Sequence, residues 1–173
     1  PGGTSEGDRH AAREQKNRDR LGELTKSFMG RILALDLGSK RIGVAVSDEL
    51  KIISRALTTI ERASRSTNLA RIRELVKEHA VQELVVGLPK NMDGSIGPQG
   101  KKAISEAEWL KKELDLPVNL WDERLSTLEA ERTLLQADLS RRKRKKVRDK
   151  LAAQIILQGY LDKISREREE GHI

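Results

Sequence analysis

The chain has 173 residues, of which 36% are hydrophobic and 35% charged, and its formal net charge is +7. This length suits one domain with an ordinary core. The absence of cysteine excludes a disulfide scaffold and a zinc–thiolate site, and it is compatible with a reducing cytoplasm. No apolar run approaches the ~20 residues of a membrane span, and no signal segment opens the chain. A basic balance of this kind is expected of a protein that binds polyanions.

Three regions can be distinguished by composition. Residues 1–29 carry many charges and few large apolar groups. Such a segment cannot bury enough surface to offset its ordering entropy, so we expect a flexible charged tail with a short helix near 11–26. Residues 30–165 hold the regular apolar patterns and form the predicted domain, and residues 166–173 form a C-terminal tail.

The first third of the domain predicts three antiparallel strands. The apolar run 32–35 indicates a buried strand that delivers Asp36 at its end, and Gly38 permits a tight turn. Apolar residues alternate over 42–46, which is typical of a second strand. A third strand is expected over 52–57.

The remaining elements alternate between helix and strand. In chain order we expect a helix over 66–79, a strand over 84–86, a helix over 103–114, a strand over 118–121, a helix that begins at the capping box of Ser126 and Glu129, and a last helix over 147–164. Crossover helices imply that strands one, four and five are parallel neighbours. The sequence therefore predicts an α/β fold with a mixed five-stranded sheet flanked by helices, whose sites lie at the carboxyl ends of the parallel strands.

Acidic residues stand at these strand ends and in the last helix. Asp36 ends the first strand, Asp122 and Glu123 follow the fifth, and Asp149 lies four residues before Ala153 on a small, apolar helix face. A carboxylate on a core-facing stripe is costly unless something satisfies it, and Mg²⁺ or Mn²⁺ would. Two such ions stabilise the attacking and leaving oxygens of a phosphoryl displacement, so this pattern favours metal-dependent phosphodiester chemistry.

Each acid alone also has a structural interpretation. Asp149 could pair along its helix with Lys145 or Lys146, and Asp36 and Asp122 could be ordinary turn residues. Only the combination of acids from separate segments favours a site.

A basic run accompanies the acids. Residues 141–146 are six consecutive arginines and lysines, one turn before Asp149, and we expect a loop or frayed helix start that contacts phosphates. Aromatic residues make up only 2%, which argues against base stacking and favours backbone contacts with structured nucleic acid. Neither a Gly-x-Gly-x-x-Gly nor a Walker A motif occurs, so dinucleotide and P-loop chemistry lose support.

Four segments, in order, resemble the motifs of the YqgF/RuvX family. They are residues 36–48 (DLGSKRIGVAVSD), 86–94 (VGLPKNMDG), 122–127 (DERLST) and 146–153 (KVRDKLAA), and the resemblance spans about 31–163. It implies an RNase H-like domain related to the RuvC Holliday-junction resolvases. It also implies a bacterial cytoplasmic nuclease that matures the 5′ end of pre-16S rRNA, with the small ribosomal subunit precursor as its partner.

The resemblance further implies the site residues. Asp36, one acid of the Asp122–Glu123 pair and Asp149 would be the catalytic, metal-binding carboxylates. Neighbours on an extended segment point to opposite sides, and we favour Glu123 for its longer reach, with Asp122 as the alternative. The residues expected to contact nucleic acid are Lys40, Arg41, Lys90, Asn91, Arg124, Arg141, Arg142, Lys143, Arg144, Lys145 and Lys146.

Two other functions remain open. A resolvase could use the same metal site on branched DNA, and it would be expected to act as a dimer on a two-fold junction. No heptad seam favours strong self-association, so we expect a monomer or weak homodimer. A non-catalytic assembly factor could instead bind ribosomal RNA through the basic face. A phosphotransferase is disfavoured, because similar sugar kinases and ATPases use two such domains around a nucleotide cleft.

Overall fold

A mixed sheet of five strands forms the centre of the computed structural model, which describes residues 6–28, 30–125 and 141–171. At 6, 8–9, 23–28 and 141–150 only the backbone is described. The strands are β1 (Arg31–Leu37), β2 (Arg41–Ser47), β3 (Ser54–Glu61), β4 (Val81–Leu88) and β5 (Val118–Asp122). Their order is β3-β2-β1-β4-β5, with β1 to β3 antiparallel and β1, β4 and β5 parallel. The predicted strand order and directions are confirmed.

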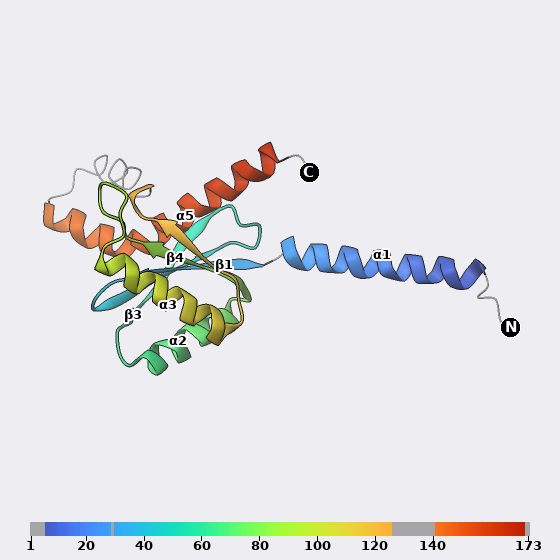
Figure 1. The fold of residues 1–173 in the computed structure, drawn as a ribbon, viewed down its shortest axis with the longest axis horizontal. Helices are drawn as coiled ribbons and strands as arrows, with labels where there is room; N and C mark the ends of the chain where they lie inside the picture. The colour runs from blue at the N-terminus through green and yellow to red at the C-terminus, as the bar shows by residue number, and fades with distance from the viewer. Residues whose placement is uncertain (1–5, 29, 126–140, 172–173) are drawn as a thin grey trace.

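Helices cover both faces of the sheet (Figure 1). The helices α2 (Arg65–Glu78) and α3 (Pro98–Leu114) lie on one face, and α5 (Arg141–Glu170) lies on the other. Alternation along β1 divides its apolar residues between the two layers: Leu33 and Leu35 pack with α2 and α3, and Ile32 and Ala34 pack with α5. Because β1 is buried on both faces, its residues 32–35 are all apolar and do not alternate with polar ones.

The α5 helix is held close to the sheet by small residues. Its buried face consists of Ala153, Ile156, Leu157 and Leu161, whose spacing keeps them on one side of the helix. Ala153 lies at the level of Gly43, where the helix passes over the carboxyl end of β1. The first turns of α5 therefore extend beyond that end of the sheet.

The third strand begins two residues later than the sequence predicts and ends four residues later. The Asp48 carboxylate accepts hydrogen bonds from the backbone N–H groups of Ile52, at 2.7 Å, and Ile53, at 2.9 Å. These bonds hold both residues in the turn after β2, with their side chains exposed, so pairing starts at Ser54. Side-chain hydrogen bonds of this kind leave little signal in hydrophobic periodicity.

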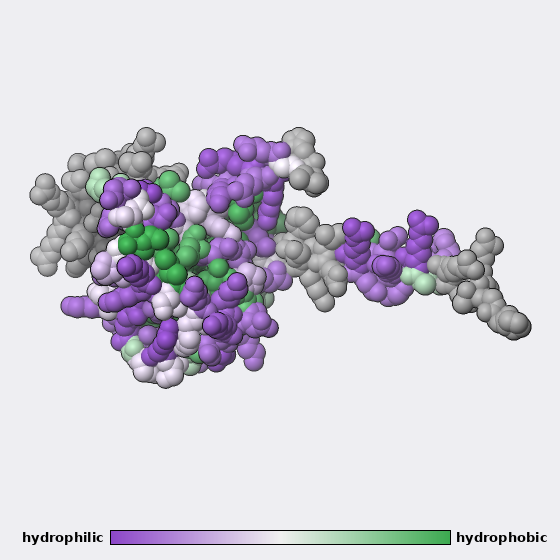
Figure 2. Space-filling model, in the orientation of Figure 1, coloured by the Kyte–Doolittle hydropathy of each residue, from purple (hydrophilic) through white to green (hydrophobic). Residues whose placement is uncertain are grey.

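The two end helices are longer than predicted. The α1 helix runs over Glu6–Phe28, and α5 includes the basic run that was expected to be a loop or a frayed start. Arginine, lysine, glutamate and glutamine are good helix formers, and neither segment contains proline. The α1 helix projects away from the sheet, and its described surface is mostly hydrophilic (Figures 1 and 2). The helix predicted from Ser126 lies outside the described residues.

In the described part of the chain, no helix combines the length and the apolar character that a membrane span requires.

We predict that the α5–sheet interface carries much of the stability. Leu157 is fully buried there, so Leu157→Ala should lower the free energy of unfolding by about 2–5 kcal/mol, because it removes apolar packing and leaves a cavity. Leu50→Ala is a matched control, because Leu50 is 67% exposed and its truncation should change stability by less than about 0.5 kcal/mol. Urea titrations of the three proteins measure both values, and equal effects would contradict the predicted interface.

Candidate active site

The carboxyl ends of β1, β4 and β5 bring two of the predicted acids to one face of the sheet. Asp36 is two residues beyond Ala34, which packs under α5, so its side chain lies on the α5 face. Glu123 directly follows β5, and its backbone N–H donates to the Leu88 carbonyl at 3.2 Å. This bond continues the β4–β5 pairing by one residue and turns Glu123 toward the same face as Asp36.

Gly87 makes the space for the Glu123 carboxylate. A Cβ built on Gly87 would lie 2.5 Å from Glu123 Oε1 and 2.7 Å from Ile156 Cδ1, and side chains do not approach this closely. Gly87 has no left-handed φ, so close approach and not backbone conformation requires glycine here. The Glu123 carboxylate, from the segment 122–127, therefore explains why residue 87 in the segment 86–94 is glycine.

Asp36 and Glu123 influence each other electrostatically. The pKa of Glu123 is raised to about 7, chiefly by burial, then by the negative charge of Asp36 and by that of Asp122. Two acids from separate strands thus lie close enough to oppose each other's ionisation. Perturbed carboxyl groups of this kind are common in functional sites.

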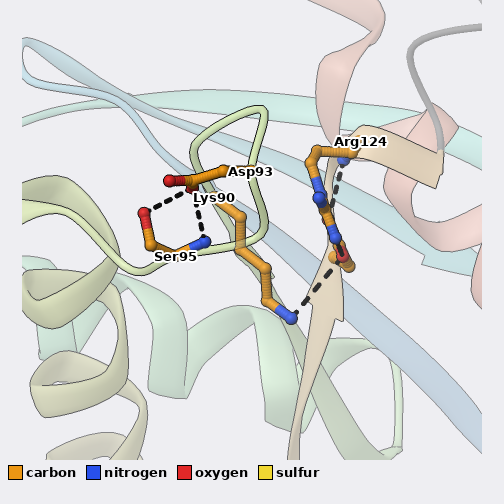
Figure 3. Close-up of polar contacts among 5 residues, drawn as sticks. Lys90, Asp93, Ser95 and Arg124 are labelled. Carbon is orange, nitrogen blue, oxygen red and sulfur yellow. Dashed lines mark hydrogen bonds and ion pairs between the residues drawn. The ribbon is translucent and has the colours of Figure 1, made fainter.

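Asp122 points into a different set of contacts. Its carboxylate accepts side-chain hydrogen bonds from Arg124, from Nε at 3.1 Å and 3.2 Å and from Nη2 at 2.8 Å, and lies 3.6 Å from Lys90 Nζ. These cations and bonds, Arg124 first, lower the pKa of Asp122. Figure 3 shows Lys90 reaching toward the end of β5 from the loop after β4, with Arg124 lying against that strand end. Neighbouring acids therefore have opposite environments: Asp122 is paired with cations, whereas Glu123 faces Asp36.

The loop after β4 is held in one shape by its own polar groups. The backbone N–H of Asn91 donates to the Ser95 carbonyl, and the Asn91 side-chain amide donates to Ser95 Oγ, both at 2.9 Å. Asp93 accepts from the Ser95 backbone N–H at 2.8 Å, and Gly94 adopts a φ of 87°, which favours glycine. Asn91, predicted to contact nucleic acid, thus has a structural role in this loop.

The other predicted residues are placed as follows. Lys40 is exposed in the β1–β2 turn, and Arg41 is exposed at the start of β2, where its Nε donates to Glu61 at 2.9 Å. Asp149 and residues 141–146 belong to α5, but their side chains lie outside the description. Among the side chains that are described, no group of three potential metal ligands occurs.

Sequence reasoning missed a cleft beside the two acids. The cleft has a volume of about 680 Å³ and is lined by Gly87 and Glu123 and, among others, by Arg62, Lys101 and Lys102. Lys101 and Lys102 stand on α3, whereas Arg62 directly follows β3. Only the crossover that places α3 beside the end of β4 brings them together, so no local pattern could have revealed them.

Comparison with known proteins identifies the family. The sequence pattern of RuvX, described as Holliday junction resolvase, matches residues 30–163. The chain belongs to the RuvX family.

Curated relatives support this assignment over most of the chain. A protein from Caldanaerobacter subterraneus subsp. tengcongensis is 57% identical over 133 residues, which cover 76% of this chain and 96% of the relative. A protein from Clostridioides difficile is 53% identical over 133 residues, covering 77% and 94%. Both carry pre-16S rRNA nuclease as a provisional name.

The fold is shared with a solved structure of RuvC. RuvC of T. thermophilus in complex with a Holliday junction substrate aligns with a TM-score of 0.50 at 15% identity, covering 75% of this chain and 91% of RuvC. This likeness confirms the predicted RNase H-like fold class for the RuvX chain.

We predict that Gly87 is required and that Gly43 is not. A Cβ on Gly43 would meet Ala153 Cβ and Asp36 Cβ at 3.5 Å, an ordinary contact, whereas Gly87→Ala forces Glu123 and Ile156 to move. Gly87→Ala should lower the free energy of unfolding by about 1–3 kcal/mol, and Gly43→Ala should have little effect or stabilise the strand. Thermal and urea unfolding of both variants check this; a loss confined to Gly43→Ala would refute the packing described.

A second prediction concerns pH. Because the folded-state pKa of Glu123 is raised, the folded chain holds an extra proton between the ordinary value of 4.5 and about 7, and stability falls as pH rises through that window. Glu123→Gln resembles the protonated form. In EDTA it should be more stable than wild type at pH 8, by about 1–2 kcal/mol after allowance for solvent screening, and nearly equal at pH 4.5. Urea unfolding across pH measures the difference; a gap that stays constant with pH would exclude Glu123 as its source.

Proposed function

We propose that this chain is a metal-dependent endonuclease of the bacterial cytoplasm that hydrolyses phosphodiester bonds in the 5′-end maturation of pre-16S rRNA. The convergence of Asp36 and Glu123 beside a basic cleft carries the proposal. A site that cleaves RNA needs acids to hold cations and basic groups to hold phosphates. The provisional names of the relatives favour pre-16S rRNA as the substrate.

The donor set fits a hard divalent cation. Asp36 and Glu123 present carboxylate oxygens, which suit Mg²⁺ or Mn²⁺, and their mutual repulsion would be relieved if both acids helped to hold such an ion. When bound, such an ion stabilises charge on the oxygens of the phosphodiester bond that is cleaved.

We include Asp149 as the third acid. It stands in α5 one turn before Ala153, which packs beside Gly43, the cross-strand neighbour of Asp36. This position at the carboxyl end of the sheet supports a role next to Asp36.

Asp122 has a different role in this proposal. Its ion pairs with Lys90 and Arg124 fix two cations beside Glu123, so Asp122 acts as a positioning residue for phosphate-binding groups. Lys40, Arg41 and the basic run at 141–146 would extend the same surface around the acids. Arg41 already forms an ion pair with Glu61, so it is a weaker candidate than Lys40 for a phosphate-binding residue.

A second candidate is a resolvase that acts on DNA four-way junctions. The description of the RuvX family as Holliday junction resolvase favours it. Its two-fold substrate would require two copies of the site, hence a dimer, whereas a maturation nuclease can act as a monomer or weak homodimer. A third candidate is an assembly factor that binds ribosomal RNA through the same basic surface but does not cleave it.

We predict that Asp36→Asn abolishes cleavage and preserves RNA binding. Loss of a metal ligand removes several kcal/mol of transition-state stabilisation, which corresponds to at least about 100-fold in rate. Wild type and variant are incubated with pre-16S RNA and with a four-way DNA junction, in Mg²⁺, Mn²⁺ or EDTA. Asp115→Asn is the matched control, since Asp115 is an exposed left-handed residue after α3 and asparagine tolerates that conformation.

Each outcome decides between the candidates. Cleavage of RNA that needs a divalent ion and Asp36 supports the nuclease, and cleavage of the junction alone supports the resolvase. Binding without cleavage by wild type supports the assembly factor. Cleavage that survives Asp36→Asn in a clean preparation contradicts the proposed site.

A further inference from the structure

The cleft beside Glu123 is positively charged along its walls. Arg62 and Arg65 line it from the β3–α2 side, and Lys101 and Lys102 line it from α3. Glu106 and Glu123 are the carboxylates among its described lining residues, and Glu106 is paired with Arg62 at 3.3 Å. In the described part of the chain neither Lys101 nor Lys102 has an ion-pair partner. The cleft therefore attracts anions, except beside Glu123.

The arginine wall is fixed relative to the acids. Arg62 Nε donates to the Gly38 carbonyl at 2.6 Å, in the turn that follows Asp36, and the same guanidinium reaches Glu106 on α3. The Arg65 guanidinium lies over the Trp109 ring, 4.1 Å from its centroid. Groups held in this way lose little entropy when a ligand binds, so the wall is prepared for an anion.

The size and chemistry of the cleft limit what can enter. Its volume of about 680 Å³ equals a cube roughly 9 Å on a side, which admits one strand, whereas a paired helix is contacted from outside across its grooves. None of the described lining residues is aromatic, so bases gain no stacking platform there. Polar groups such as Asn68, Gln99 and Ser105 line the remaining surface.

We infer that this cleft binds an unpaired RNA strand that leads away from the cleaved bond, through its phosphates and independently of base sequence. The inference rests on the proposed nuclease function, because it takes the part of the cleft that Glu123 lines as the place of cleavage. Lys101 and Lys102 are assigned as phosphate-binding residues for that strand, and Arg65 as a further cation on the opposite wall. A structured substrate would thus be held as a duplex on the basic surface, with its single-stranded extension in the cleft.

The test compares two double variants of the same helix. Lys101→Ala/Lys102→Ala removes two charges from the cleft, and Lys111→Ala/Lys112→Ala removes two exposed charges from the other end of α3, where they line a separate hollow near Pro117. The probes are an RNA hairpin with a blunt end and the same hairpin with a single-stranded extension at its 5′ or 3′ end. Binding is measured by fluorescence anisotropy in EDTA over a range of salt, so cleavage does not contribute.

We expect weaker binding only for the cleft variant and only on an extended hairpin. The slope of log Kobs against log salt should become shallower by about 1.4, because each single-strand phosphate that a lysine neutralises contributes about 0.7 to the slope. The blunt hairpin should bind both variants as it binds wild type. Unchanged melting temperatures confirm that the exposed lysine substitutions leave the fold intact.

Several results would overturn the inference. RNA binding that is weakened equally in the two double variants, or equally on blunt and extended hairpins, would contradict it. So would RNA binding that is unchanged in both variants, or a wild type that does not bind RNA. Cleavage in Mn²⁺ is assayed separately on the same RNAs. If wild type cleaves neither the blunt nor the extended hairpins but binds the extended ones through the cleft, the proposed function is contradicted and the binding of a single strand in the cleft is supported.

Discussion

The repulsion between Asp36 and Glu123 is the constraint around which the rest of the site is arranged. Two carboxylates of like charge converge at the ends of strands in the parallel part of the sheet, and burial together with this repulsion raises the pKa of Glu123 to about 7. Gly87 provides the room for one of them, and Lys90 and Arg124 neutralise the third nearby acid, Asp122. The fold maintains an unfavourable pair, which is understandable when a cation is to be held there.

Much of the fold and part of this site could be predicted from the sequence. Apolar runs and crossover helices indicated the strand order, and the order placed Asp36 and the Asp122–Glu123 pair at the same edge of the sheet. Because neighbouring side chains on an extended segment point to opposite sides, the sequence also indicated that Asp122 and Glu123 point in different directions. The different surroundings of the two acids could not be predicted, because the contacts of Arg124 with Asp122 and the space over Gly87 for Glu123 depend on the three-dimensional arrangement of the strand ends.

The features that could not be predicted depend on contacts between distant or polar groups. The start of β3 is set by one carboxylate, Asp48, whose hydrogen bonds have no apolar periodicity. The cleft wall joins the end of β3 to α3 through Arg62 and Glu106, which are 44 residues apart. The amide of Asn91, a residue that is predicted to contact nucleic acid, also holds the loop that carries Lys90, and no pattern in the sequence indicates this structural role.

The close contact of α5 with the sheet at Gly43 and Ala153 has a consequence for insertions and deletions in this helix. Gly43 and Ala153 meet where the helix passes Asp36, and Leu157 and Leu161 fix the turns that follow. Each residue of a helix advances about 1.5 Å and rotates about 100°. Inserting or deleting one residue between 147 and 152 would rotate the part of α5 that precedes the change by about 100° relative to its buried face. A single-residue change in this stretch would therefore alter which side of the helix the basic run 141–146 occupies, even though the buried face itself stays unchanged.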